Sequence, residues 1–126
     1  MCIRDSSGVS SEIVKISKWF NHAPSDKTKS GIGLLKKVIL QCKNYLYSNS
    51  IIILPIISLS NVKSALKFAK TKLNVIKIRK FYWPMPKYLI RNIDLMKKLK
   101  KNYYIDYEKK YGNFVCYTLI LVCKKK

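Results

Sequence analysis

Acidic residues are scarce in this chain of 126 residues, which has 6 Asp and Glu against 26 Lys and Arg and a formal net charge of +20. A field of this strength attracts polyanions, so nucleic acid or an acidic membrane surface is one interpretation of the charge. A second interpretation stays open. Nearly all the cations are Lys and occur with abundant Ile, Asn and Tyr, a composition that an A+T-rich genome produces without any binding function.

Residue patterns that carry catalytic or metal chemistry are also missing. The cysteines are Cys2, Cys42, Cys116 and Cys123. No two of them have C-x-x-C spacing, so neither a zinc site nor a thioredoxin-like motif is predicted, and we expect reduced, mostly buried thiols. His22, the only histidine, is expected to be a surface loop residue rather than a base or a metal ligand. Without a carboxylate pair, a nucleophile–base pair or a P-loop, hydrolase and kinase functions have no support.

Long apolar runs are absent too, because none approaches the roughly 20 residues of a membrane-spanning helix. The longest, residues 114–123, is predicted to be a strand. We therefore expect a cytoplasmic protein without a membrane partner. The length allows one domain and excludes a two-domain enzyme. A hydrophobic fraction of 48% is enough to build a core, which excludes wholesale disorder.

The first residues of the chain are expected to be an artefact. Residues 1–6, MCIRDS, resemble a peptide that appears when sequencing-adapter DNA is translated at the end of an assembled fragment. We therefore set residues 1–7 aside and take residues 8–126 as part of a single domain. On this interpretation Met1 is not the true start, and further sequence lies upstream.

From Gly31 onward the chain alternates between helix and strand, which is typical of a layered α/β sheet. Periodic apolar residues predict helices over about 32–47 and 61–72, and a third that carries Leu89 to Leu99. The predicted strands are residues 51–54, residues 75–82 with a bulge near Lys80, and residues 113–123, the last preceded by a turn at Tyr111 and Gly112.

The strand at residues 51–54 is the most informative of the three. Its unalternating apolar run predicts a strand buried on both faces of a parallel sheet, with Pro55 at its carboxyl end. Such a strand needs neighbours on both sides, so three strands make only part of a sheet. Ser58 and Ser60 are expected to cap the helix that follows. Residues 83–86, which hold two prolines, are predicted to be irregular.

Four motifs in residues 30–126 resemble the C-terminal half of a class I S-adenosylmethionine-dependent methyltransferase, in particular the small-domain methyltransferases. Residues 30–35, SGIGLL, are similar to the Gly-Gly-x-x-Gly-Leu segment that begins the helix before the fifth strand. Residues 51–60 resemble that strand and its serine-bearing exit, and residues 81–86 the Pro-x-Pro segment after the sixth strand. Residues 111–122 resemble the antiparallel last strand.

The resemblance implies a partial Rossmann-like sheet, with a parallel strand, a C-terminal antiparallel strand and flanking helices, whose N-terminal half is missing. It implies an enzyme that moves a methyl group from S-adenosylmethionine to a nitrogen of RNA, DNA or a protein amide. The glycine-rich turn and the acidic residue that bind the cofactor in this family are not in this sequence. The fragment itself is therefore expected to be inactive and not to bind the cofactor.

The resemblance also suggests site residues. The Asn-Pro-Pro-Tyr-type motif of the family, which holds the methyl acceptor, is nearest to residues 21–24, Asn-His-Ala-Pro, although the second proline and the aromatic are missing. This match follows a strand-like segment at residues 13–16, and it makes Asn21 the catalytic candidate and Pro24 a substrate-binding candidate. The other substrate-binding candidates are Ser58, Ser60, Trp83 and Pro84.

Two of these assignments have structural alternatives, and the function as a whole has a rival. The serines cap a helix or line a cleft at the strand ends. Trp83, with Phe81 and Tyr82, packs into the core or a lid, or forms a stacking platform. The rival function is a small basic module that binds RNA or DNA without catalysis. The net charge and the tyrosine-rich residues 103–107 favour it.

Overall fold

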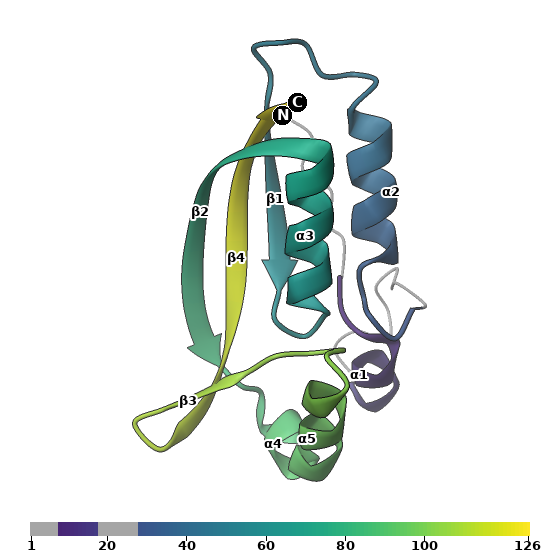
Figure 1. Ribbon diagram of the computed structural model, residues 1–126. Helices are drawn as coiled ribbons and strands as arrows, with labels where there is room; N and C mark the ends of the chain where they lie inside the picture. The colour runs from purple at the N-terminus through teal and green to yellow at the C-terminus, as the bar shows by residue number, and fades with distance from the viewer. Residues whose placement is uncertain (1–7, 18–27) are drawn as a thin grey trace.

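The computed structural model describes residues 8–17 and 28–126 as a mixed α/β arrangement (Figure 1). The elements are α1 (Ser11–Ile16), α2 (Gly33–Cys42), β1 (Ile51–Ile57), α3 (Val62–Lys72), β2 (Leu73–Pro84), α4 (Lys87–Arg91), α5 (Ile93–Lys101), β3 (Glu108–Lys110) and β4 (Asn113–Lys125). No helix in these two ranges is long and apolar enough to cross a lipid bilayer. Residues 1–7, Asn21, His22 and Pro24 lie outside the described residues.

The sheet is open, and β4 is its central strand. β1 pairs with one edge of β4 and β2 with the other, both antiparallel, and β3 pairs with the beginning of β4. Because both neighbours run antiparallel to β4, β1 and β2 run in the same direction. The hairpin between β3 and β4 turns at Tyr111 and Gly112, as the sequence predicted.

Helices cover one face of this sheet. Figure 1 shows α3 in front of the strands and α2 beside it. Leu35 and Ile39 of α2 and the small residues Ala65 and Ala69 of α3 join a core that includes Leu121 of β4. The alanines let α3 lie close to the strands. At the other end of the sheet α1, α4 and α5 form a second core around Leu89 and other apolar residues.

β1 is buried on one face only, so the prediction of a strand buried on both faces is wrong for the described chain. Ile52, Leu54 and Ile56 are buried, whereas the residues between them are exposed, for example Ile53 at 45%. The helices α2 and α3 pack on one face, and no described helix covers the other. The alternation of buried and exposed residues in β1 therefore comes from the packing of helices on one face only. A continuous run of apolar residues in the sequence does not reveal it.

Pro55 lies inside β1 and not at its carboxyl end. The backbone N–H of Ser58 donates to the Tyr117 carbonyl of β4. Because backbone direction alternates along a strand, the nitrogen of Pro55, three residues earlier, faces away from β4. A proline is tolerated there because this edge of β1 needs no donor for its pairing with β4.

Other predicted elements also need correction. Residues 13–16 are helical, because the Ser10 carbonyl accepts from the N–H groups of Ile13 and Val14 and so starts α1. The helix predicted over 32–47 ends at Cys42. The third predicted helix is broken at Asn92, whose side-chain amide donates to the Tyr88 carbonyl at 2.7 Å and competes with the helical hydrogen bonds.

The strand β2 is longer than predicted, and its bulge lies elsewhere. The register against β4 shifts between Val75 and Lys77, so Ile76 and not Lys80 is the extra residue. Trp83 and Pro84, which were predicted to be irregular, still pair with β4 as the last two residues of the strand. Proline fits this place because β2 is an edge strand of the described sheet.

Candidate functional site

Ser58, directly after β1, is completely buried and joins three segments. Its hydroxyl oxygen accepts from the Tyr117 N–H at 3.0 Å, and its carbonyl accepts from the Asp106 N–H at 2.6 Å. These bonds fix the end of β1 to the centre of β4 and to the segment before β3. The serine hydroxyl satisfies the backbone donor of Tyr117, which would otherwise be buried without a partner.

Neither serine caps α3, which corrects the sequence prediction. The Ser60 hydroxyl donates back to the Ile57 carbonyl at 2.6 Å. The cap is Asn61, whose side-chain oxygen accepts from the Ser64 N–H at 3.0 Å. Ser60 lies one residue before the cap, where its hydroxyl reaches the strand but not the first turn of the helix.

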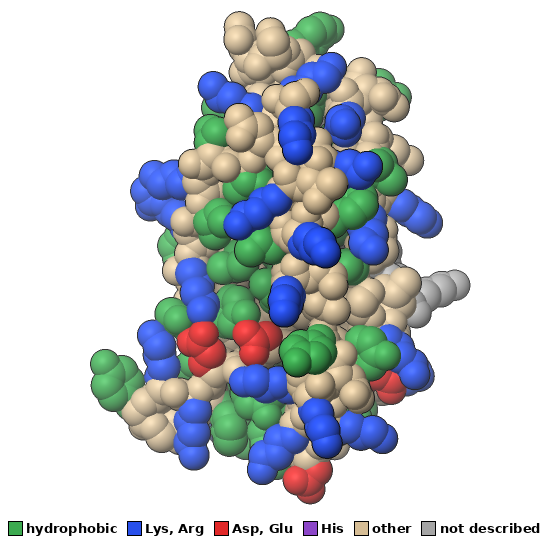
Figure 2. Space-filling model, in the orientation of Figure 1, with side chains coloured by type: hydrophobic (Ala, Val, Ile, Leu, Met, Phe, Trp, Pro, Cys, Tyr) green, Lys and Arg blue, Asp and Glu red, His purple; other side chains and the backbone are tan. Residues whose placement is uncertain are grey.

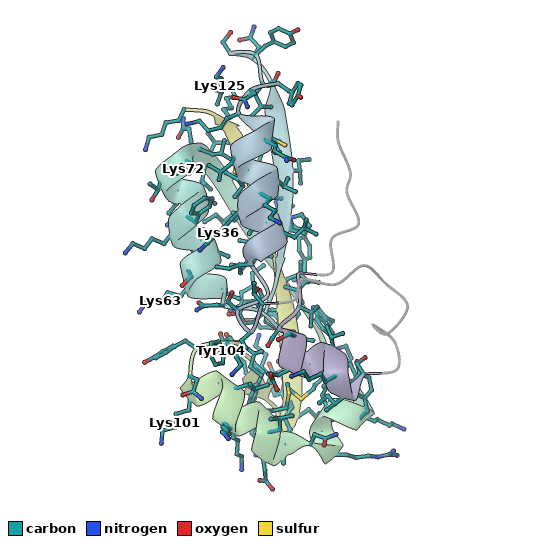
Figure 3. All side chains as sticks on the ribbon, turned by 90° about the vertical axis from the view of Figure 1, so that its right-hand side faces the viewer. Lys36, Lys63, Lys72, Lys101, Tyr104 and Lys125 are labelled. Atoms are coloured by element: carbon teal, nitrogen blue, oxygen red, sulfur yellow. The ribbon has the colours of Figure 1, made fainter. Side chains whose placement is uncertain are left out.

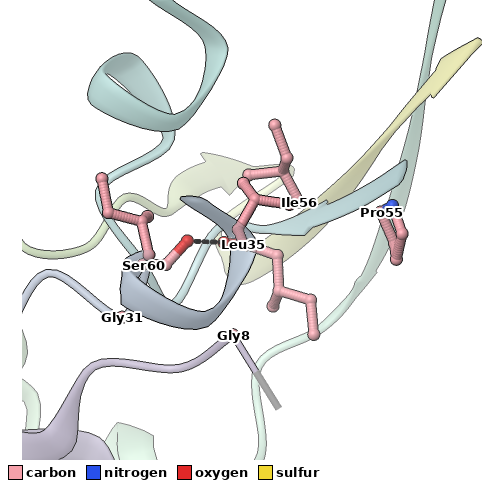
Figure 4. A pocket seen from close by; sticks show the side chains of 8 residues that line it. Gly8, Gly31, Leu35, Pro55, Ile56 and Ser60 are labelled. Carbon is pink, nitrogen blue, oxygen red and sulfur yellow. Dashed lines mark hydrogen bonds between the residues drawn. The ribbon is translucent and has the colours of Figure 1, made fainter. Parts of the chain in front are cut away.

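The turn before α2 brings distant segments of the chain to the end of β1. Gly31 has φ +70°, and the neighbouring Ser30 carbonyl accepts from the Asn61 N–H at 2.7 Å. The Ser10 N–H donates to the Leu59 carbonyl at 2.8 Å. A small pocket of about 20 Å³ lies here, lined by Gly8, Gly31, Ile32, Leu35, Pro55, Ile56, Ile57 and Ser60 (Figure 4). It has room for about one water molecule and not for a nucleotide cofactor.

The aromatic residues near the end of β2 divide between packing and exposure. Trp83 is half-buried, and its indole N–H donates to the Thr118 hydroxyl at 3.0 Å. Phe81 and Tyr82 are about half exposed. Ser58 contacts Tyr117 and Trp83 contacts Thr118, so two candidate residues reach adjacent positions of β4 from its two sides. Packing therefore accounts for Trp83, whereas Phe81 and Tyr82 keep surface that a ligand can touch.

A buried tyrosine of β4 pairs with an acidic group in the segment before β3, and sequence reasoning missed this arrangement. The Tyr117 hydroxyl donates to the carboxylate of Asp106, whose other oxygen lies 3.5 Å from the Lys100 ammonium. Burial and the carboxylate of Asp106 raise the pKa of Tyr117 well above its usual value. The ammonium group of Lys80 lies 4.1 Å from the centre of the Tyr117 ring and 2.7 Å from Glu108. The hydrogen bond from Lys80 lowers the pKa of Glu108.

This pair belongs to a longer row of lysines and tyrosines. Most neighbours in the row are in ring contact, whereas a backbone hydrogen bond joins Tyr103 to Lys100, and Asp106 joins Lys100 to Tyr117. Tyr82 packs edge to face on Tyr117, with 6.3 Å between ring centres, and the Lys110 ammonium lies 3.6 Å from the centre of the Tyr82 ring. At the other end the Lys63 ammonium lies 5.9 Å from the Tyr103 ring. We call these residues the lysine–tyrosine row: Lys63, Tyr103, Lys100, Tyr117, Lys80, Tyr82 and Lys110.

The helical face formed by α2 and α3 is cationic, and its own elements hold no acidic residue. No Asp or Glu occurs between Asp26 and Asp94, a range that holds all of α2, β1, α3, β2 and α4. Figure 2 shows Lys and Arg side chains spread over this helical face, with acidic groups only near its lower part. In Figure 3, Lys63 of α3 and Lys101 of α5 extend outward on the same side. The face thus presents lysines that no acid of its own elements can neutralise.

The two cysteines of β4 are predicted to be unreactive in the folded protein. Cys116 and Cys123 are completely buried, as the sequence suggested, and burial raises the pKa of each thiol to about 11. At pH 8 only about one such thiol in a thousand is the reactive thiolate. In a timed reaction with iodoacetamide followed by mass spectrometry, Cys42 should be modified before either of them. Modification of Cys116 or Cys123 at the rate of the urea-unfolded chain would contradict their burial.

The described residues contain no group of three or more His, Cys, Asp or Glu that could hold a metal ion. Comparison of the chain with models of protein families, with curated protein sequences and with solved structures finds no match. The functional argument therefore rests on the geometry of the strand ends and on the charged helical face.

Proposed function

We propose that this chain is the C-terminal part of an S-adenosylmethionine-dependent methyltransferase of class I, whose whole form methylates a nitrogen of nucleic acid or of a protein amide. The order of the strands is the observation that carries this proposal. The motifs match β1 to the fifth strand of the family, β2 to the sixth and β4 to an antiparallel last strand. β4 lies between two strands that run in one direction, and it runs against both.

The positions of the candidate residues support the same proposal. Ser58 and Ser60 follow the carboxyl end of β1, and Trp83 and Pro84 form the carboxyl end of β2. Ligands of open α/β sheets bind at the carboxyl ends of parallel strands. Methyl transfer needs little more from a protein than alignment of the acceptor nitrogen with the sulfonium methyl group, which such a cleft provides. In the whole enzyme Asn21 and Pro24 would contribute to holding that nitrogen.

The described residues do not fit the cofactor by themselves. The pocket beside Gly31 holds about one water molecule, and its lining offers one hydroxyl, that of Ser60, which already donates to Ile57. None of the described residues that line it is acidic, so none of them can bind the ribose hydroxyls as an acidic residue would. Under the proposal the missing strands supply the cofactor site, and no step of the reaction is assigned to this pocket.

The uncovered face of the sheet agrees with missing structure. Ile51 and Ile53 of β1 are about half exposed on this face, beside the partly exposed Ile120 and Val122 of β4. An apolar face of this kind, next to a strand edge that is unpaired among the described residues, is normally covered in a native protein. Further strands beside β1 and a layer of helices on this face would complete the domain.

Sequencing the source DNA upstream of the Ser7 codon tests the proposal. We expect an open reading frame that encodes a strand, a glycine-rich turn and an Asn-Pro-Pro-Tyr-like motif. A stop codon followed by a genuine start at this place would overturn it.

As a second test, calorimetric titration of the 126-residue chain with S-adenosylmethionine should show no micromolar binding, whereas the longer chain should bind. Micromolar binding by the short chain would contradict the assignment of the cofactor site to the missing half.

A further inference from the structure

We infer that the lysine–tyrosine row binds single-stranded nucleic acid, with Tyr103 stacking on a base and Lys63 contacting the phosphate backbone. This inference does not depend on the methyltransferase proposal. It rests on the backbone conformation of two exposed tyrosines, Tyr103 and Tyr111. It also rests on the contact of Lys63 with the Tyr103 ring, on the lysines that precede Tyr111 in the chain, and on the lack of acidic residues in α2 and α3.

Tyr103 occupies a position that normally belongs to glycine. It follows α5 with φ +62°, and the N–H groups of Tyr103 and Tyr104 donate to the carbonyls of Lys100 and Leu99. This is the helix ending in which a left-handed residue is required and glycine is preferred. The Tyr103 side chain is 67% exposed, so burial of the ring does not offset the strain. Strained positions that persist without a packing reason are concentrated at functional sites.

Tyr111 repeats the pattern at the other end of the row. It has φ +51° in the turn between β3 and β4, next to Gly112 with φ +78°, and its side chain is fully exposed. Turns with two left-handed residues favour Asn-Gly at these positions. Lys109 and Lys110 directly precede the ring. Both strained positions therefore present an aromatic ring beside lysines.

The positive charge of the row favours a polyanion as its partner. The two carboxylates next to the row, Asp106 and Glu108, are already paired with Lys100 and Lys80, which leaves Lys63 and Lys110 to face a ligand. The exposed rings of Tyr103 and Tyr111, each beside lysines, match a strand whose bases are free to stack and whose phosphates lie between them, while the buried Tyr117 supports the row from within. A duplex hides its bases and a lipid headgroup has no flat ring, so neither uses Tyr103.

The variant Tyr103→Gly separates binding from folding, because glycine suits the backbone at this position. We would measure the anisotropy of a fluorescently labelled 12-nucleotide oligo(dT), and of a duplex of equal length, with the 126-residue protein at 50 and 200 mM salt. The wild type should prefer the single strand. Tyr103→Gly should weaken single-strand binding about fivefold or more, while its thermal midpoint stays the same or rises. Lys63→Gln should reduce the slope of the logarithm of the binding constant against the logarithm of the salt concentration by about one, because one phosphate contact is lost.

Two control variants remove equivalent groups at a distance. Tyr47→Ala deletes an exposed ring from the loop between α2 and β1, at the opposite end of the molecule from α5 (Figure 1). Lys37→Gln removes an exposed lysine of α2. Both should bind the oligonucleotide like the wild type. The inference is overturned if Tyr103→Gly binds unchanged, if the duplex binds as tightly as the single strand, or if phosphatidylserine vesicles bind in place of the oligonucleotide.

Discussion

Replacing Gly31 with alanine is expected to lower the free energy of unfolding by about 2–4 kcal/mol. A Cβ atom on Gly31 would lie 2.6 Å from the backbone nitrogen of Ser10 and 2.6 Å from the carbonyl carbon of Val9. Backbone atoms cannot rotate away as a side chain can, so the segment before α1 must move. That movement would break the hydrogen bond from Ser10 to Leu59 and disturb the end of β1.

Gly112→Ala is the matched control for this prediction. Gly112 has a similar φ of +78°, but a Cβ atom there would meet nothing within 4 Å. Gly112→Ala should therefore lower the free energy of unfolding only by the strain of a left-handed alanine, about 1–2 kcal/mol. Urea unfolding of both variants, followed by circular dichroism, gives the two free energies. Equal losses would show that the contact between residues 9–10 and the Gly31 turn is absent in solution.

Local pattern was sufficient to predict most of the elements. The helical spacing of Leu35 and Ile39, the alanines of α3 and the turn at Gly112 are properties of neighbouring residues, and the structure confirms them. The predictions that failed concern features that are set by tertiary contacts rather than by the local pattern. The one-sided burial of β1 follows from which face the helices cover, and the break at Asn92 follows from a single side-chain hydrogen bond.

The candidate site was predictable only in part, for the same reason. Residue types placed Ser58, Ser60 and Trp83 at strand ends, where they lie. Their hydrogen bonds were not predictable, because each partner is set by tertiary structure: Tyr117 for Ser58, and Thr118 for Trp83. The lysine–tyrosine row joins residues from α3, β2, β3 and β4 and from the end of α5. In the sequence its only signal was the run of tyrosines at 103–107.

Leu121→Ala is expected to lower the free energy of unfolding by about 2–5 kcal/mol. Leu121 is completely buried in the central strand, in the core that also contains Ile39 and Ala65. Its neighbour Ile120 points to the opposite face of the sheet, which the described helices leave open, and is only partly buried. Ile120→Ala should therefore lower the free energy of unfolding by about 1 kcal/mol or less in the 126-residue chain.

The same pair of variants tests whether further structure covers the open face. If the longer chain expected from the methyltransferase proposal adds a layer over Ile120, the effect of Ile120→Ala should rise toward that of Leu121→Ala in that chain, because the side chain becomes buried. Urea unfolding of both variants in the short and the long chain measures this change. An Ile120→Ala effect that stays small in the long chain would mean that the added residues do not pack on this face. Equal effects in the short chain would contradict the one-sided sheet itself.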